Sequence, residues 1–235
     1  MDTQTRHDLK KDKFAIAAAS SASWVSENRS TAIRWSIIAA VALVLVVGGI
    51  ILYTTQSDAA STALGAALDV YAKPLAQPGA PAEKGTFSTS SDRSKAANQQ
   101  FAAVAQKYGW LPEGTKAQYF AGVTYEDLGQ NAQAETELKS AAGAWNANMA
   151  NLGKLALAGL YHRTNRDSQA IDLYNAIIAK PSDTVPATAA QLDLADLYVA
   201  MGKQDQARAV WAKVKDADKD GAAGTIATQK LTAKQ

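Results

Sequence analysis

The sequence of 235 residues contains no cysteine and only two histidines, His7 and His162. The absence of cysteine excludes disulfides, zinc–thiolate sites, iron–sulfur clusters and thiol nucleophiles. With two imidazoles in the whole chain, neither a two-histidine metal site nor a histidine relay is expected. We therefore predict that the protein holds no metal and no cofactor.

The chain also has little net charge, with 24 Lys and Arg against 22 Asp and Glu. Residues 1–34 hold six basic and four acidic residues, which leaves 18 of each from Asp58 onward. Binding to a phosphate backbone needs clustered Lys and Arg, so no nucleic-acid partner is expected. A hydrophobic content of 47% excludes a disordered chain and is enough for a packed core.

One segment, Trp35 to Tyr53, has no charged residue and reads WSIIAAVALVLVVGGIILY. A helix of that length spans roughly 28 Å, enough to cross a bilayer, and Trp35 and Tyr53 stand where aromatic rings favour the headgroup level. A buried core helix seldom stays apolar on every face for so long. A cleaved signal peptide would have a shorter apolar region, followed by a small-x-small site. The sequence predicts an uncleaved transmembrane anchor at residues 35–53.

Charge around this anchor predicts its orientation. The six basic residues of the first 34 precede it, and Lys73 is the one basic residue among the first twenty that follow. Basic flanks stay on the cytoplasmic side, so residues 1–34 are expected to be cytoplasmic. If the source is bacterial, the protein lies in the inner membrane as a single-pass protein with a periplasmic C-terminal domain.

The cytoplasmic segment carries a weak helical stripe that begins at Phe14 and ends at Val25. Its members recur at helical spacing, and Lys10, Lys11 and Lys13 stand at its start. The stripe is compatible with a helix lying on the anionic inner leaflet or on a membrane partner. It is equally compatible with a frayed tail, because alanine and serine supply little apolar area.

Three copies of one pattern follow the anchor, at offsets of 36 and 37 residues. The copies are Gly122, Tyr125, Gly129, Ala134, Leu138 and Ala141; Ala158, Tyr161, Asn165, Ala170, Tyr174 and Ile177; and Ala195, Tyr198, Gly202, Ala207, Trp211 and Val214. Small residues let two helices approach closely, while the large ones fill the space beside them. Gly129, Asn165 and Gly202 fall where the first helix must turn, at positions that tolerate positive φ. The pattern resembles the tetratricopeptide (TPR) repeat.

The predicted fold class is therefore all-α, a single transmembrane helix followed by an α-solenoid of TPR-like helix pairs. A degenerate first unit is expected at 59–108, because Ala97, Phe101 and Val104 repeat the second-helix pattern and Leu64, Ala67, Leu68 and Tyr71 supply a first helix. Its proline- and glycine-rich stretch at 74–92 is expected to be an exposed loop. The remaining boundaries are repeats at 115–148, 151–184 and 188–221, a capping helix at 224–234, and a repeat domain of 58–235 overall.

A stack of this kind presents a curved surface and favours binding over catalysis. In TPR arrays the groove is lined by the first helix of each repeat. The resemblance then implies a partner-binding groove made of Lys116, Tyr119, Val123, Glu126, Leu152, Leu155, His162, Leu192, Asp196 and Val199, with Gly159 and Ala189 between them. Most of these are apolar and suit an amphipathic or apolar peptide segment. The alternative is that individual members are filled by the protein's own helices.

Two features suggest other chemistry. The run from Asp216 to Gly221 matches the opening of a calcium loop, but position twelve is Ala227, where a bidentate Glu is required. A helix-to-helix turn is favoured, and a calcium-responsive module remains a minor alternative. His162 has no nucleophile or carboxylate spaced to meet it, so a surface or groove histidine is favoured over an acid–base group. No catalytic constellation can be assembled, and an enzyme is not expected.

The order of these segments is similar to that of the ancillary Sec-translocon subunit family: a basic cytoplasmic segment, one N-in span and periplasmic repeats ending in the unit from Ala195 to Trp211. The resemblance implies a scaffold that assists protein export or folding. Its partners would be translocon subunits, a membrane-anchored chaperone or emerging chains. A runner-up is an adaptor of cell-envelope assembly or cell division.

Overall fold

The computed structural model describes residues 28–77 and 85–233, and the chain divides into two compact units, Met1–Thr55 and Gln56–Gln235. In the described residues every regular element is a helix, apart from an isolated bridge between Leu75 and Phe87. The helices are α2 (Arg29–Tyr71), α3 (Ser90–Tyr108), α4 (Pro112–Asp127), α5 (Asn131–Ala142), α6 (Ala147–Arg163), α7 (Asp167–Ala179), α8 (Ala187–Ala200), α9 (Gln204–Ala217) and α10 (Ala222–Thr232). The predicted all-α class is confirmed.

The first unit contains the apolar part of α2. From Ile33 to Tyr53 the large apolar side chains of this helix are between 46% and 70% exposed. The helix is long and apolar enough to cross a membrane, as the sequence predicts for residues 35–53. The predicted stripe from Phe14 to Val25 lies outside the described residues.

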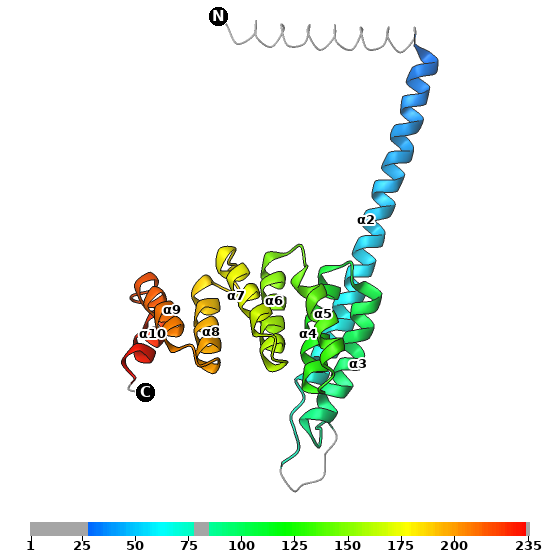
Figure 1. Cartoon of the computed structure of the whole chain (residues 1–235). Coiled ribbons are helices and arrows are strands. Elements are labelled where there is room, and N and C mark those ends of the chain that lie inside the picture. The colour runs from blue at the N-terminus through cyan, green and yellow to red at the C-terminus, as the bar shows by residue number, and fades with distance from the viewer. Residues whose placement is uncertain (1–27, 78–84, 234–235) are drawn as a thin grey trace, which may run out of the picture. The chain divides into compact units, whose positions relative to one another are not determined.

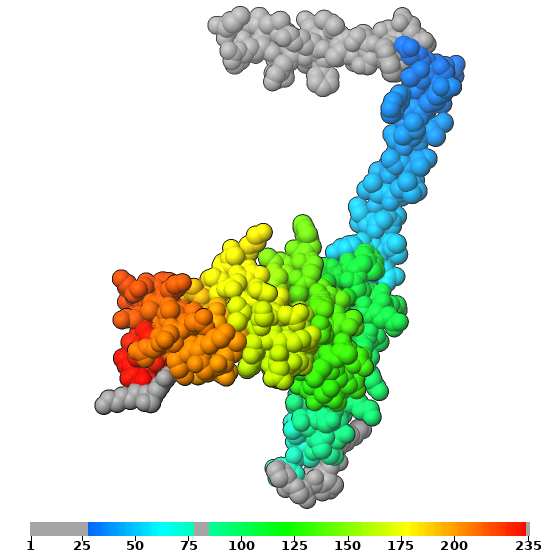
Figure 2. Space-filling model, viewed as in Figure 1, coloured from blue at the N-terminus to red at the C-terminus, as the bar shows by residue number. Residues whose placement is uncertain are grey.

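The second unit is a succession of helix pairs, α4 with α5, α6 with α7, and α8 with α9 (Figure 1). Each helix packs on the next along the chain, and the space-filling view shows consecutive helices in contact (Figure 2). The first helices of the first two pairs begin earlier than the predicted repeat bounds, at Pro112 instead of 115 and at Ala147 instead of 151. Local chemistry explains both starts: a proline suits the first turn, and the Asn146 side chain accepts a hydrogen bond from the Met149 amide.

The repeated alanines lie at the contacts inside the pairs. Ala134, Ala170 and Ala207 on the second helices are all fully buried. In the first pair Gly122 of α4 lies against Leu138 of α5, where a Cβ would come within 2.6 Å of the Leu138 Cγ atom. The absence of a side chain at Gly122 permits this close approach of α4 and α5.

The turns inside the pairs have the predicted left-handed residue. Gly129, Asn165 and Gly202 have φ values of 71°, 58° and 72°. In the first turn the amides of Gly129 and Gln130 donate to carbonyl oxygens of the preceding helix, which closes its C-terminus. The predicted conformation of these three positions is confirmed.

The stack of the second unit begins with the last part of α2, which packs with α3 and α4. Ala60, Leu64 and Ala67 are buried in one cluster with α3 and α4 residues. The rings of Tyr71, Phe101 and Phe120 meet there, with 5.1 Å between the centres of the two phenylalanines. Residues 56–71 of α2 therefore form part of the core of the second unit.

The predicted loop at 74–92 is too long at its C-terminal end. Helix α3 begins at Ser90, because the Thr89 side chain accepts a hydrogen bond from the Asp92 amide at 3.0 Å and caps the helix. Before it, the Ala76 amide donates to the Phe87 carbonyl oxygen. The stretch from Leu75 to Phe87 is thus closed at its base by backbone hydrogen bonds.

Helix α10 ends the described part of the stack. Ala227 is fully buried in a cluster with Trp211 and Val214 of α9, and the helix also packs on α8. This is the arrangement that a terminal helix needs to cover the last pair. Its bounds are Ala222–Thr232, against the predicted 224–234.

Candidate partner-binding face

Ten residues predicted to line a groove lie on the first helices of the three pairs, and we call this set the helix-A face. Helix α4 carries Lys116, Tyr119, Val123 and Glu126; α6 carries Leu152, Leu155 and His162; and α8 carries Leu192, Asp196 and Val199. Helix α4 packs on α6, and α8 packs on α10. The members on α4 and α6 therefore lie on neighbouring helices, and within each helix the members follow helical spacing.

Of the four members with acidic, basic or imidazole side chains, three pair within the chain. Glu126 forms an ion pair with Arg163, which links α4 to α6. His162 Nδ1 lies 2.7 Å from Asp167 Oδ1, so the prediction that no carboxylate is spaced to meet His162 is wrong: the turn between α6 and α7 brings Asp167 back beside it. Asp196 Oδ1 lies 3.0 Å from the Lys230 ammonium group of α10. The first and third pairs link alternate helices, α4 with α6 and α8 with α10, and the His162–Asp167 contact links α6 to α7. They also satisfy the charges that a charged partner would otherwise meet.

The apolar members are half-buried. Tyr119, Leu152 and Leu155 pack against the central core, while Leu192 and Val199 pack against the C-terminal core. Burial raises the pKa of the Tyr119 phenol, and the nearby Glu126 carboxylate raises it further. Part of each side chain thus belongs to internal packing, and only its outer part faces solvent.

Behind this face, Tyr174 of α7 is buried beside α8. Burial raises its pKa to about 12, and the Asp193 carboxylate adds to the effect. The phenol therefore stays neutral at physiological pH. It serves as packing material, as its place in the repeat pattern predicts.

Lys116 lies about one turn of α4 before Tyr119 and also belongs to a second feature of the surface. It lines a pocket of about 520 Å³ between the α3–α4 turn and the α5–α6 turn. Trp110 and Trp145 flank the pocket, and Leu111, Pro112 and Met149 supply further apolar lining. The side chain of Trp110 is 63% exposed, and that of Trp145 is fully exposed.

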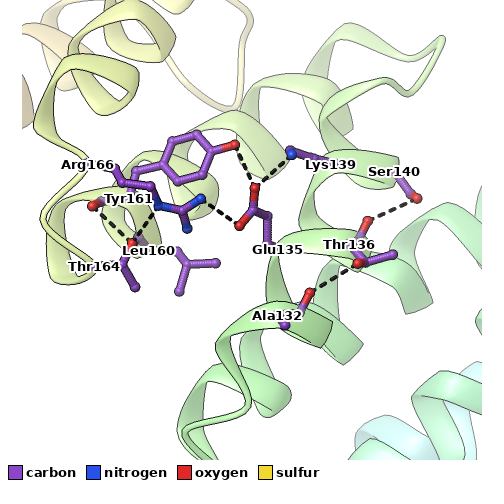
Figure 3. A network of polar contacts seen from close by, with 9 residues as sticks. All are labelled: Ala132, Glu135, Thr136, Lys139, Ser140, Leu160, Tyr161, Thr164 and Arg166. Atoms are coloured by element: carbon purple, nitrogen blue, oxygen red, sulfur yellow. Dashed lines mark hydrogen bonds and ion pairs between the residues drawn. The ribbon is translucent and has the colours of Figure 1, made fainter.

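The repeats are also joined by a polar network around Glu135 of α5 (Figure 3). Its Oε1 lies 2.7 Å from the Lys139 ammonium group and accepts a hydrogen bond from the Tyr161 hydroxyl group. Its Oε2 accepts from Arg166 Nη1 at 2.7 Å, and the Arg166 guanidinium stacks 4.3 Å from the Tyr161 ring centre. Hydrogen bonds from Lys139 and Arg166 lower the pKa of Glu135. The network fixes the position of the second pair against the first.

The Asp- and Gly-rich run at 216–221 connects two helices. Asp218 Oδ2 accepts a hydrogen bond from the Gly224 amide at 3.1 Å, in the first turn of α10. Across residues 28–77 and 85–233, no group of three or more His, Cys, Asp or Glu side chains is placed to hold a metal ion. In this geometry Asp218 is the C-cap residue of α9, and its carboxylate satisfies an amide in the first turn of α10, whose N-cap residue is Gly221.

Comparisons with protein-family models, with curated proteins and with solved structures found no match to this chain.

Sequence reasoning missed the two tryptophans at the pocket. They lie in the short segments between helices, GWLP and AWN, outside the repeated columns. A large aromatic residue in a turn, where polar residues predominate, is the signal that could have identified them.

Proposed function

We propose that the protein is a membrane-tethered binding scaffold that acts at protein export. The observation that carries this proposal is the composition of α2. Between Ile33 and Tyr53 the helix exposes large apolar side chains all round, and from Ala60 to Tyr71 it is built into the core of the second unit. One continuous helix thus supplies an apolar anchor and the first helix of a stack of pairs.

The stack supports a binding role. Its helix-A face combines half-buried apolar side chains with charges that are already paired, so a partner would meet mainly apolar surface. Such a face suits an amphipathic helix or an apolar extended segment. Chains that emerge from a translocon offer segments of this kind before they fold.

The partner class rests on the resemblance in layout to the ancillary Sec-translocon subunits. We propose that the face binds emerging chains or a membrane-anchored chaperone, and that the anchor associates with translocon subunits. The basic asymmetry around residues 35–53 favours an N-in orientation with the stack across the membrane.

Site-specific photocrosslinking in native membranes tests this function. A photoreactive amino acid replaces Val123 or Val199 on the helix-A face, and Gln169 or Lys213, both exposed on second helices, serves as the matched control. We expect adducts with emerging chains, translocon subunits or a membrane-anchored chaperone at the face positions and not at the controls.

Other outcomes discriminate between functions. Face-specific adducts with lipoproteins or division proteins would support the envelope adaptor instead. Equal adducts at face and control positions would contradict binding through this face.

A further inference from the structure

The second unit has few exposed large apolar side chains in its described residues, and two of them are tryptophans. The set is Leu75, Trp110, Trp145 and Ile226. Trp110 follows α3 and Trp145 follows α5, and both line the same pocket. The two turns therefore share one end of the helix stack. We call residues 109–111 and 143–146 the tryptophan end.

Packing places this end beside the first residues of the second unit. Helix α3 runs antiparallel to the last part of α2, because Arg93 Nη1 donates to the Lys73 carbonyl oxygen and the Arg93 guanidinium lies 5.5 Å from the Tyr71 ring centre (Figure 1). From Arg93 to Tyr108 the helix advances roughly 22 Å. The same length measured back along α2 from Tyr71 reaches Gln56. The tryptophan end thus lies at the level where the chain enters the second unit.

The connection between the expected span and the second unit is short. Gln56 stands three residues after Tyr53, the last residue of the expected span. At about 3.3–3.6 Å per residue even a fully extended connection covers roughly 10 Å. Gln56 itself is therefore close to the headgroup region of a membrane that holds residues 35–53, and the tryptophan end lies at the same end of the second unit as Gln56.

The chemistry of the tryptophan end matches that region. An indole ring is amphipathic and concentrates at the membrane–water interface. Pro112 and Met149 add apolar surface beside the rings, and Lys116 adds a cation that can meet an anionic headgroup. The pocket has no acidic residue in its lining. Aromatic rings beside a basic side chain are typical of surfaces that contact lipid headgroups.

We propose that the tryptophan end rests on the headgroup layer of the membrane that holds α2. The proposal depends on the tether described under Proposed function and goes beyond it, since the tether alone requires no contact between the stack and lipid. Such a contact would limit the movement of the stack relative to the membrane and give the helix-A face a fixed approach to emerging chains.

Fluorescence quenching on the full chain tests this contact, and the absence of cysteine makes single labels possible. Gly143→Cys carries an environment-sensitive fluorophore at the tryptophan end, where a Cβ meets only ordinary contacts of 3.5 Å and more. Asn131→Cys is the matched control, because it is exposed and begins α5 at the opposite end of α4. Both proteins are reconstituted into vesicles of phosphatidylethanolamine and phosphatidylglycerol that contain lipid with a nitroxide near the headgroup.

We expect the label at position 143 to show blue-shifted emission and strong quenching by the nitroxide lipid, and the label at 131 to show neither. Replacement of both tryptophans, Trp110→Ser with Trp145→Ser, should remove the difference between the two positions. Ile226→Ser, which removes an exposed apolar side chain of α10, should preserve it. Circular dichroism spectra identical to the parent show that the variants are folded.

Three results would overturn the proposal. They are equal quenching at positions 143 and 131, a blue shift at 143 without quenching by lipid, which would indicate a protein occupant, and unchanged quenching after loss of both tryptophans. Flotation of the vesicles separates this failure from failure of the tether. Protein that floats with the lipid keeps the tether, whereas protein that stays at the bottom of the gradient contradicts the tether itself.

Discussion

The two parts of α2 share one continuous backbone and differ in their surroundings. Between Ile33 and Tyr53 aliphatic side chains cover every face and are exposed, whereas further along Ala60, Leu64 and Ala67 form one stripe that is buried. Exposed apolar surface costs about 25 cal/mol for each Å² left in water, and the first part is long and apolar enough to cross a membrane. The second part has polar residues on its other faces and is completed by α3 and α4. Apolar residues on every face thus mark the part of α2 that suits lipid, and apolar residues in a single stripe mark the part that packs in a protein core.

The largest expected effect comes from placing one arginine in either part. Leu64→Arg puts an unpaired charge into the buried stripe and should cost the second unit about 4 kcal/mol or more. Val44→Arg, at the middle of the expected span, should oppose membrane insertion by about 2.5–3.5 kcal/mol and leave the stability of the stack unchanged. Thermal unfolding in detergent, followed by circular dichroism, reports the first effect, and the fraction resistant to carbonate extraction reports the second.

Other results for these two variants would contradict the comparison between the two parts of α2. A Val44→Arg protein with a lowered Tm and unchanged extraction would show that the apolar part of α2 is packed against protein. A Leu64→Arg protein with unchanged Tm would show that the stripe is not part of the core.

A smaller effect is expected at the helix contacts inside the pairs. Ala170 is fully buried, so Ala170→Leu should overpack the middle pair and cost roughly 1–3 kcal/mol. Its exposed neighbour provides the control, because Gln169→Leu adds a side chain of the same size to the surface. Urea unfolding should show a lower midpoint for the first variant only. Equal midpoints would mean that the repeat register is wrong.

The helix-A face should respond in two measurements at once. Leu155 and Leu192 are half-buried, so the double variant Leu155→Ser with Leu192→Ser should lower stability by roughly 1 kcal/mol for each residue, about half the value of full burial. It should also reduce photocrosslinking from position 123. A loss of stability without loss of crosslinking would assign these side chains to internal packing alone.

The smallest effect concerns the Glu135 network and depends on pH. Because hydrogen bonds from Lys139 and Arg166 lower the pKa of Glu135 in the folded state, its contribution is present above the ordinary value of 4.5 and is lost as the pH falls through the lowered value. Glu135→Gln should therefore destabilise the protein by about 1 kcal/mol at neutral pH. The difference from the parent should shrink at pH values below 4.5. A difference independent of pH would show that charge on Glu135 does not matter.

Local features of the second unit followed directly from the sequence. The buried alanines and the left-handed turns at Gly129, Asn165 and Gly202 depend on residue size and on backbone sterics within a short stretch of chain. The boundaries were less exact, since Thr89 and Asn146 extend their helices through side-chain caps that the repeat pattern does not contain.

The candidate site was harder to predict, because it depends on distances between helices. The pairing of Glu126 with Arg163 and of Asp196 with Lys230 brings together residues that are far apart in sequence, and no spacing rule within one helix specifies it. The placement of Lys116 beside Trp110 and Trp145 likewise depends on two turns meeting at one end of the stack. A register taken from one repeat cannot give contacts between repeats.

The central claim is that the apolar part of α2 crosses a membrane and that the stack lies on the side opposite the N-terminus. The absence of cysteine permits a direct measurement in intact spheroplasts with a membrane-impermeant maleimide. Asn131→Cys in the stack should be labelled at once, and Thr5→Cys near the N-terminus only after the membrane is permeabilised. Labelling of both positions before permeabilisation, or the reverse order, would contradict the claim.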